Sequence, residues 1–348
     1  MKVLHGNRLG AVAKVLIALC LTAAFAFGAN SADEAFERGL EAYDRGYLQE
    51  AVKQYTQVIK IDPNDAYAYN GRGLAYTDLG DTSKAIADYT QAIKIDPKYA
   101  EAYNNRGLAY AKLGDYSKAI ADYTQAIKIG NYAEAYNNRG NAYYDLGDYS
   151  KAIADYTQAI KIDPNDAESY YIRGVVYYVL DDYSKAIADY TQAIKIDPND
   201  AYFYYIRGDV YAELGDYSKA IADYTQAIKI DPNDAYFYYN RGDVYAKLGD
   251  TSKAIADYTQ AIKIDDYAYA YNGRGLAYAK LDDYSKAIAD FTQAIKIDPK
   301  YAEAYNNRGL AYAKLGDYKT ATKDARKGCE LGDCKFLQYL AQKKLLRD

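Results

Sequence analysis

The side chains that most often carry catalytic or metal chemistry are nearly absent from this sequence. The chain has 348 residues, and its only histidine is His5. Nearly the whole chain therefore lacks the residues usually needed for a Ser-His-Asp triad, a histidine general base, a zinc site of the His/Cys type or a haem site. The remaining candidates for chemistry are carboxylates and three cysteines.

The carboxylates do not form a recognisable reaction centre. Paired carboxylates suit glycoside hydrolysis, but nearly all of the 48 acidic residues recur at a fixed interval, as framework residues would. Junctions such as Asp197-Pro198-Asn199-Asp200 lack the ligand spacing and the glycine of a calcium loop. We expect no enzyme activity, no cofactor and no metal site.

Two cysteines lie close together near the C-terminus. Cys329 and Cys334 flank the sequence ELGD, in which Gly332 favours a turn. The favoured interpretation is a disulfide between them, and two free thiols are the alternative. A disulfide would persist in an oxidising compartment.

The first 29 residues differ from the rest of the chain. A basic start is followed by an apolar run over 15–27 and then by small residues, which is typical of a signal peptide with cleavage within 26–31. An uncleaved membrane anchor is the alternative. We expect an exported protein, periplasmic or secreted, with no membrane span after removal of the signal.

The charge of the chain is acidic. It has 43 basic and 48 acidic residues, and the loss of three basic residues with segment 1–29 would change the net charge from −5 to −8. We find no basic patch in the sequence pattern, so we expect neither nucleic acid nor an anionic membrane surface as a partner.

A repeat of 34 residues organises nearly all of the remaining chain. The pair Arg-Gly recurs nine times at intervals of 33 or 34 residues, and the intervals predict a solenoid. The arginines are Arg38, Arg72, Arg106, Arg139, Arg173, Arg207, Arg241, Arg274 and Arg308. The nine repeats span 32–334 and start near residues 32, 66, 100, 133, 167, 201, 235, 268 and 302.

Each repeat reads as two helices separated by a turn. Counted from the arginine, Tyr recurs at −3 and +4, Gly at +1, Ala at +13 and +20, and an aromatic residue at +17. Gly114 suits a left-handed helix end, and Asp115 or Ser117 can cap the second helix. Asp96-Pro97 stops that helix, because the residue before proline is disfavoured in helical geometry. Small residues at +1, +13 and +20 let the two helices approach closely.

The pattern Y-x2-R-G-x2-Y, A-x3-Y and P resembles the tetratricopeptide repeat, with Tyr where that family often has Trp and Arg where it often has Leu. The resemblance implies an all-α fold, a right-handed superhelical solenoid of nine helix-turn-helix repeats, with a C-terminal capping helix within 335–348. An arginine on an inward face needs a partner. Asp at +16, present in eight repeats, is the predicted one.

The other face of the first helix holds positions −5, −2, −1, +2, +5 and +6. In tetratricopeptide proteins this face lines a concave groove that grips extended peptides. The Lys and Arg that bind a terminal carboxylate in some members are replaced here, so we do not expect that clamp. The groove residues predicted for this chain are Asn104, Asn105, Asn137, Asn138, Asn141, Tyr171, Tyr178, Tyr202, Tyr205, Asp209, Tyr236, Tyr239, Asp243, Asn306 and Asn307.

These residues indicate recognition rather than catalysis. Asn can donate to and accept from a peptide backbone, and Tyr offers a large contact area with few rotors. With the nearby aspartates, the tyrosines suit a protein or extended peptide that is basic and partly apolar. Packing of these tyrosines against neighbouring helices is the structural alternative. The functional alternatives are a carbohydrate-contacting scaffold of envelope polysaccharide assembly or export, and a self-assembling protein, because near-identical repeats can associate end to end.

Overall fold

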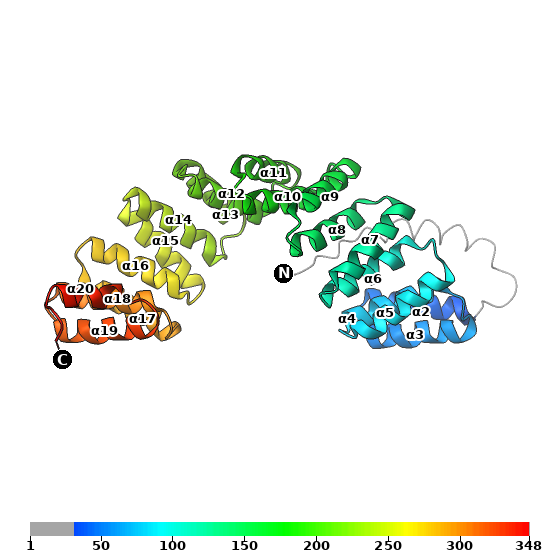
Figure 1. Ribbon diagram of the computed structural model, residues 1–348, viewed down its shortest axis with the longest axis horizontal. Helices are drawn as coiled ribbons and strands as arrows, with labels where there is room; N and C mark the ends of the chain where they lie inside the picture. The colour runs from blue at the N-terminus through cyan, green and yellow to red at the C-terminus, as the bar shows by residue number, and fades with distance from the viewer. Residues whose placement is uncertain (1–30, 348) are drawn as a thin grey trace. The chain divides into compact units, whose positions relative to one another are not determined.

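The computed structural model describes residues 31–347. Within this range the chain has no strands, and its helices form nine consecutive pairs followed by one shorter helix (Figure 1). The prediction of an all-α repeat protein is therefore confirmed. The predicted signal peptide, 1–29, lies outside the described residues.

The chain divides between Ile162 and Asp163 into two compact units. The helix pairs of the first unit are α2 Ser31–Asp44 and α3 Leu48–Ile61, α4 Ala66–Asp78 and α5 Thr82–Ile95, α6 Ala100–Lys112 and α7 Tyr116–Gly130, α8 Ala133–Asp145 and α9 Tyr149–Ile162. Those of the second unit are α10 Ala167–Val179 and α11 Tyr183–Ile196, α12 Ala201–Glu213 and α13 Tyr217–Ile230, α14 Ala235–Leu248 and α15 Thr251–Ile264, α16 Ala268–Lys280 and α17 Tyr284–Ile297, α18 Ala302–Lys314 and α19 Tyr318–Glu330, followed by α20 Lys335–Gln342.

The turn inside each repeat follows the sequence signals. Gly114 has a φ of +78°, which an L side chain rarely adopts. The Asp115 carboxylate then accepts a hydrogen bond from the Lys118 backbone N–H, capping α7. Where glycine is missing from this turn, Asp181 and Asp282 take the left-handed conformation. Short local signals therefore define the ends of these helices.

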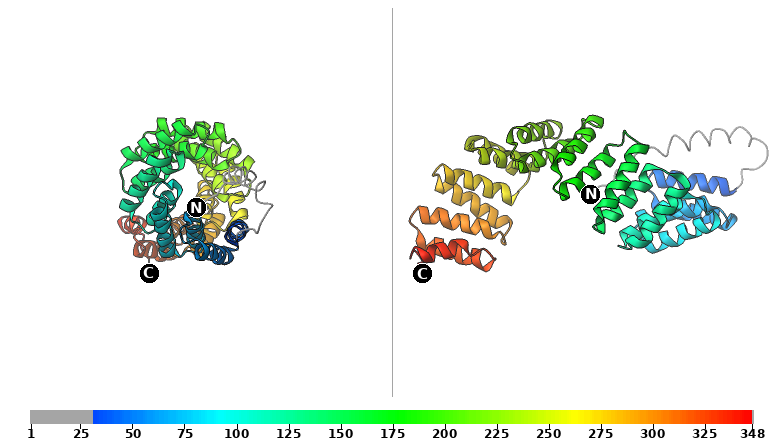
Figure 2. Two further views of the ribbon diagram at one scale, coloured as in Figure 1. Left: turned by 90° about the vertical axis from the view of Figure 1, so that its right-hand side faces the viewer. Right: turned by 45° about the horizontal axis from the view of Figure 1, so that its top comes forward.

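The two helices of a repeat have different neighbours. Within each unit, the second helix of a repeat packs against the first helix of the next one, as α13 does against α14. The first helices of successive repeats also contact one another, as α12, α14 and α16 do. Within residues 31–347, the second helices of successive repeats do not pack against one another to the same degree. Within each unit the first helices therefore form the inner layer. Figure 2 shows the pairs of the second unit following one another from green to red.

A glycine and a tyrosine set the spacing between the two helices of a repeat. A Cβ added to Gly107 would lie 2.6 Å from Cε1 of Tyr123 at position +17, whose ring is buried. Gly73 and Tyr89 repeat this contact at the same distance. A side chain at the glycine would push the helices apart, so position +1 is restricted to glycine by packing rather than by backbone conformation.

The predicted Arg–Asp pair is confirmed in eight repeats, with N–O distances of 2.7–2.8 Å. Each arginine donates two hydrogen bonds to one carboxylate, and its Nη1 in several repeats also reaches the preceding repeat, as from Arg106 to Thr90 Oγ1 at 3.1 Å. This third contact was not predicted. The first repeat has Gln54 at the aspartate position, and its exposed Arg38 pairs with Glu34 instead.

The C-terminal helix completes the last repeat. Position +17 holds Ala325 instead of an aromatic residue, and the ring of Phe336 in α20 lies against Gly309 in its place. The capping helix, predicted within 335–348, spans Lys335–Gln342. Lys344 adopts a left-handed φ of 56°, and the Leu345 N–H bonds back to the Leu340 carbonyl, which stops the helix.

Two further links hold the C-terminal segment on α19. Cys329 and Cys334 are joined by a disulfide across the turn between α19 and α20, as favoured from their spacing. The Arg347 backbone N–H donates to the buried Thr322 hydroxyl at 3.0 Å. The last segment is therefore fixed to α19 at both of its ends.

The Arg–Asp pair predicts a site-specific loss of stability. Replacing Asp223 with Ala leaves the mostly buried Arg207 without its charge partner, which should lower the free energy of unfolding by about 3 kcal/mol. Arg38→Ala, which breaks an exposed pair, should change it by less than about 0.5 kcal/mol. Urea denaturation followed by circular dichroism measures both, and equal effects would contradict the assigned role.

Removal of the Phe336 ring should loosen the last repeat selectively. We expect Phe336→Ala to speed amide hydrogen exchange in α18 to α20, because the ring fills the space over Gly309, at a cost of about 3 kcal/mol. Exchange in α10 and α11 should be unchanged, since neighbouring repeats stabilise one another mainly through direct contact. Uniform acceleration over the second unit would show that the ring is not a local cap.

Candidate functional site

The predicted groove asparagines are largely engaged with one another. Asn105 Nδ2 donates to Asn70 Oδ1 at 3.1 Å, and Asn138 Nδ2 donates to Asn104 Oδ1 at 3.0 Å. Asn307 makes the equivalent bond to Asn272. In each case an amide at −1 donates to the amide at −2 of the repeat before it. The asparagines thus form a ladder that joins successive first helices.

Burial separates these asparagines further. Asn104 and Asn306 are 2% and 8% exposed, so the expectation that their side chains face a peptide is wrong. Position −2 points into the contact between successive first helices, which periodicity alone does not reveal. Asn137 is half-buried, and Asn141 accepts a hydrogen bond from the Tyr156 hydroxyl at 2.8 Å. The structure therefore gives the asparagines a framework role.

In the second unit the ladder is interrupted and tyrosines replace it. Tyr171, Tyr205 and Tyr239 occupy position −2 of three successive repeats, and Tyr202 and Tyr236 occupy position −5 of two of them. The ring of Tyr202 lies 5.6 Å from that of Tyr171 and 5.9 Å from that of Tyr205. Tyr202 and Tyr236 are 46% and 51% exposed, which is high for large aromatic rings. The tyrosines at −2 are half-buried beneath them.

Further tyrosines extend this surface, and two of them, Tyr267 and Tyr301, were not predicted to lie on it. Tyr267, in a junction one residue shorter than most, lies with its ring 5.1 Å from both Tyr236 and Tyr239. Tyr269 connects it to Tyr301, at 5.4 and 4.9 Å between ring centroids. The sequence signal that could have identified Tyr267 and Tyr301 is position −7, which holds Tyr in some repeats and a capping Asp in others. Tyr178 lies apart from this chain of rings, beside Tyr183.

Two carboxylates lie on the same successive first helices as these tyrosines. Asp209 accepts a hydrogen bond from the Tyr224 hydroxyl at 2.6 Å, and Asp243 accepts one from Tyr258 at the same distance. Most other repeats have Leu or Val at this position. We call these two carboxylates with the surrounding rings the aromatic-acidic surface. Its residues are Tyr171, Tyr202, Tyr205, Asp209, Tyr236, Tyr239, Asp243, Tyr267, Tyr269 and Tyr301.

Burial shapes the electrostatics of this surface. It raises the pKa of Asp209 to about 6, although hydrogen bonds from Tyr224 and Tyr205 favour the charged form and oppose the shift. The pKa of Asp243 is raised for the same reason. Burial and the nearby aspartates raise the pKa of Tyr205 and Tyr239, so both hydroxyls stay protonated and can donate. The surface thus offers negative charge partly shielded from water.

The described residues show no other centre for chemistry. No group of three or more His, Cys, Asp or Glu side chains in residues 31–347 is arranged to hold a metal ion. In the same range no helix combines the length and the apolar character needed to cross a membrane. The aromatic-acidic surface is therefore the strongest candidate for a binding site in the described chain.

Comparison with known families agrees with the repeat pattern. The TPR repeat family matches over 39–80, 73–114, 140–181, 208–249 and 280–316. Tetratricopeptide repeat matches cover 100–129, 167–200, 189–222, 235–266 and 302–331. The chain belongs to the tetratricopeptide repeat family. Proteins of this family are generally non-catalytic scaffolds that bind proteins or peptides. No curated protein matches the chain.

Solved structures provide further comparisons. The C-terminal part of a TPR repeat-containing protein from Cytophaga hutchinsonii is 21% identical, with 68% of this chain and 97% of that chain covered and a TM-score of 0.59, which shows the shared fold. MamA is 28% identical over 49% of this chain and 96% of its own, with a TM-score of 0.43. YrrB, a TPR protein with an unusual peptide-binding site, is 24% identical over 54% and 97%, with a TM-score of 0.46.

The environment of Asp209 predicts its titration. We expect carboxyl 13C NMR to give an apparent pKa near 6 for Asp209. In Tyr224→Phe it should rise further, because the lost hydrogen bond favours the charged form. Exposed Asp216, whose pKa is lowered by hydrogen bonds from Lys219, should not change in that variant. A lower Asp209 pKa in Tyr224→Phe would contradict the geometry.

The same shift fixes the sign of a stability change. The pKa of Asp209 is higher in the folded chain than the ordinary value of 3.8, so folding favours the protonated acid. Ionisation of Asp209 therefore costs stability above pH 6, and that cost declines as pH falls from about 6 toward 3.8. Between pH 7 and pH 5, the stability gained by Asp209→Asn relative to the unchanged chain should shrink in urea denaturation.

Proposed function

We propose that this tetratricopeptide repeat protein is a non-catalytic scaffold that binds an extended, basic and partly apolar peptide segment through its aromatic-acidic surface. The observation that carries the proposal is the pair Asp209 and Asp243. Two carboxylates on successive first helices accept hydrogen bonds from tyrosine hydroxyls, at a position where most repeats have an aliphatic residue.

The energetics favour a cationic ligand group. A shielded carboxylate attracts a Lys or Arg side chain more strongly than a fully solvated one would, because the effective dielectric is lower. Tyrosine faces beside it also attract cations and bury aliphatic stems. Each carboxylate with its rings, such as Asp209 with Tyr202 and Tyr205, can thus accept one basic side chain.

The spacing of the first helices indicates the spacing of those basic residues. Packed helices lie about 10 Å apart, and a chain in the polyproline II conformation advances about 3.1 Å per residue with three residues per turn, so its residues i and i+3 face the same side. A peptide that crosses α12 and α14 would therefore bring residues i and i+3 to Asp209 and Asp243. We expect basic residues at that interval, with apolar residues between them facing the tyrosines.

We place this function outside the cytoplasm, in the periplasm or in the secreted fraction. The signal-like segment 1–29 supports export. The disulfide between Cys329 and Cys334 is a further support, because such bonds persist in oxidising compartments.

Selection from a random peptide library tests the ligand class. Peptides retained by the purified protein should be enriched in Arg or Lys at positions i and i+3 with aromatic or aliphatic residues between, and sodium chloride should weaken their binding. Asp209→Asn with Asp243→Asn should weaken binding by about tenfold or more, as the loss of charge-assisted contacts implies. Binding of the unchanged protein should also weaken as pH falls below 6.

The matched control removes the same charge elsewhere in the second unit. Asp216→Asn with Asp250→Asn alters two residues that cap second helices, and an asparagine can keep their hydrogen bonds to backbone N–H groups. This control should bind peptides as strongly as the unchanged protein does.

Enrichment of acidic peptides, or equal peptide binding by both double variants, would refute the proposal. Retention of a neutral glycan in a salt-independent manner would favour the carbohydrate alternative, and growth in size with protein concentration would favour self-assembly.

A further inference from the structure

The second helix of the last repeat differs sharply in charge from its counterparts. The corresponding helix of the preceding repeat has small or neutral residues at four positions, and α19 has a basic residue at each of them. The four changes along the repeat are Ser285 to Lys319, Ala289 to Lys323, Thr292 to Arg326 and Gln293 to Lys327.

These four residues lie on one side of α19. Their spacing of i, i+4, i+7 and i+8 places them along a single helical face, and all four are exposed. Like charges at i and i+4 destabilise a helix. Packing within the solenoid does not require these side chains, since repeats two to eight have Ser, Ala, Thr and Gln at the four positions. The charge of this face therefore calls for a reason beyond stability.

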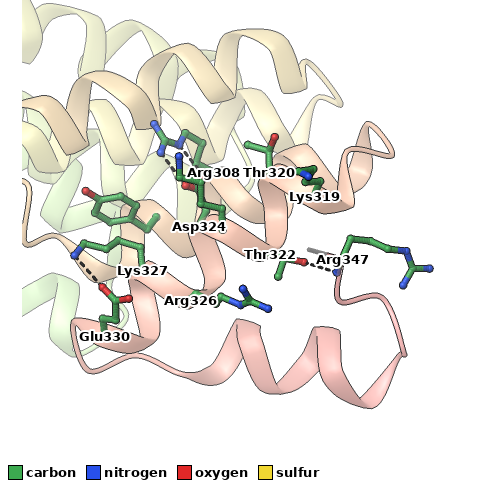
Figure 3. A pocket seen from close by; sticks show the side chains of 11 residues that line it. Arg308, Lys319, Thr320, Thr322, Asp324, Arg326, Lys327, Glu330 and Arg347 are labelled. Atoms are coloured by element: carbon green, nitrogen blue, oxygen red, sulfur yellow. Dashed lines mark hydrogen bonds and ion pairs between the residues drawn. The ribbon is translucent and has the colours of Figure 1, made fainter.

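A cavity of about 680 Å³ lies along this face, between α18, α19 and the C-terminal segment (Figure 3). Six basic and two acidic residues line it, together with Tyr305 and two threonines. The wall opposite α19 is held by the hydrogen bond from the Arg347 backbone to Thr322. Its size is that of a typical small-ligand pocket.

The two carboxylates of the cavity are already paired. Asp324 receives two hydrogen bonds from Arg308, and Glu330 forms an ion pair with Lys327 at 3.0 Å. No carboxylate of residues 31–347 lies within ion-pair distance of Lys319 or Lys323. This local excess of positive charge corrects the expectation, drawn from the acidic composition, that the chain has no basic patch.

We propose that this cavity is a binding site for a multivalent oxyanion of the phosphate or sulfate type. Lys319 and Lys323 supply charge, and Arg326 and Arg347 line the same cavity. The site is separate from the aromatic-acidic surface, which has the opposite charge, and it adds a second kind of ligand to the proposed scaffold.

The spacing of the lysines indicates a ligand with more than one anionic group. Four helical residues advance about 6 Å along the axis, so Lys319 and Lys323 can each contact a different anionic group of one ligand. A single phosphate would leave one of them unused. Multivalent anions such as tripolyphosphate, or a phosphorylated headgroup with several charges, satisfy both.

Calorimetric titration of the purified full chain with tripolyphosphate tests the site. We expect saturable binding with one site per chain, at least tenfold tighter than binding of inorganic phosphate. Lys319→Gln with Lys323→Gln should weaken it by about tenfold or more, since two charge-assisted contacts are lost. Both positions are exposed, so the fold should persist, and circular dichroism checks this.

The matched control removes two lysines from other repeats of the same unit. Lys219→Gln with Lys253→Gln changes two exposed lysines that pair with Asp216 and Asp250, and it should leave tripolyphosphate binding unchanged. Equal weakening by both double variants would show a response to net charge only. That result, or equal affinity for phosphate and tripolyphosphate, would overturn the proposal.

Vesicles that contain phosphatidylglycerol distinguish a free anion from a lipid headgroup. Vesicle binding that tripolyphosphate displaces, and that Lys319→Gln with Lys323→Gln abolishes, would identify a displayed headgroup as a source of the same chemistry. Tripolyphosphate binding without vesicle binding would identify a free anion. Vesicle binding that tripolyphosphate does not displace, with no binding of tripolyphosphate itself, would indicate a membrane-contacting surface in place of the proposed cavity site.

Discussion

A recurring arginine makes the contacts on which most of this solenoid depends. In repeat three, Arg106 on the first helix holds Asp122 of the second helix through two hydrogen bonds and reaches Thr90 of the preceding repeat with a third. One side chain thereby connects three helices. Because a guanidinium has a rigid fork of donors, it fixes the angle between helices as well as their separation. Such a pair is costly to bury, so its benefit lies in a defined geometry rather than in large net stability.

The packing around that arginine divides the tyrosines into two groups. Rings at +17 are buried against the glycine at +1, as Tyr123 is against Gly107, and rings at −3 and +4 flank the guanidinium or a lysine, as Tyr103 and Tyr110 do. These positions are needed in nearly every repeat. Tyrosines at −5, −2 and −7 are not needed in every repeat, and those at −2 stand where the asparagine ladder is interrupted. The framework thus leaves a face on which recognition residues can vary without loss of the fold.

The second unit uses this freedom for two surfaces of opposite charge. The aromatic-acidic surface keeps Asp209 and Asp243 partly away from water, so a cation meets a carboxylate in a low-dielectric setting. The C-terminal cavity holds Lys319 and Lys323, which form no ion pair with a carboxylate of the described chain, and a disulfide and a backbone hydrogen bond hold its wall. Both arise by substitution within a repeat whose packing contacts are kept.

The sequence by itself determined the repeat, the helix ends, the Arg–Asp pair and the capping role of the C-terminal segment, because each depends on residues at fixed offsets within one repeat or its neighbour. It could not separate position −2 from position −5 on the first helix, since both belong to the same helical stripe. Only the tertiary structure buried Asn104, joined it to Asn138 and left Tyr202 exposed. It also brought Tyr267 onto the aromatic-acidic surface and Arg347 to α19. Contacts of this kind depend on how neighbouring helices and the C-terminal segment pack together, and the periodicity of residues along a single helix does not specify that packing.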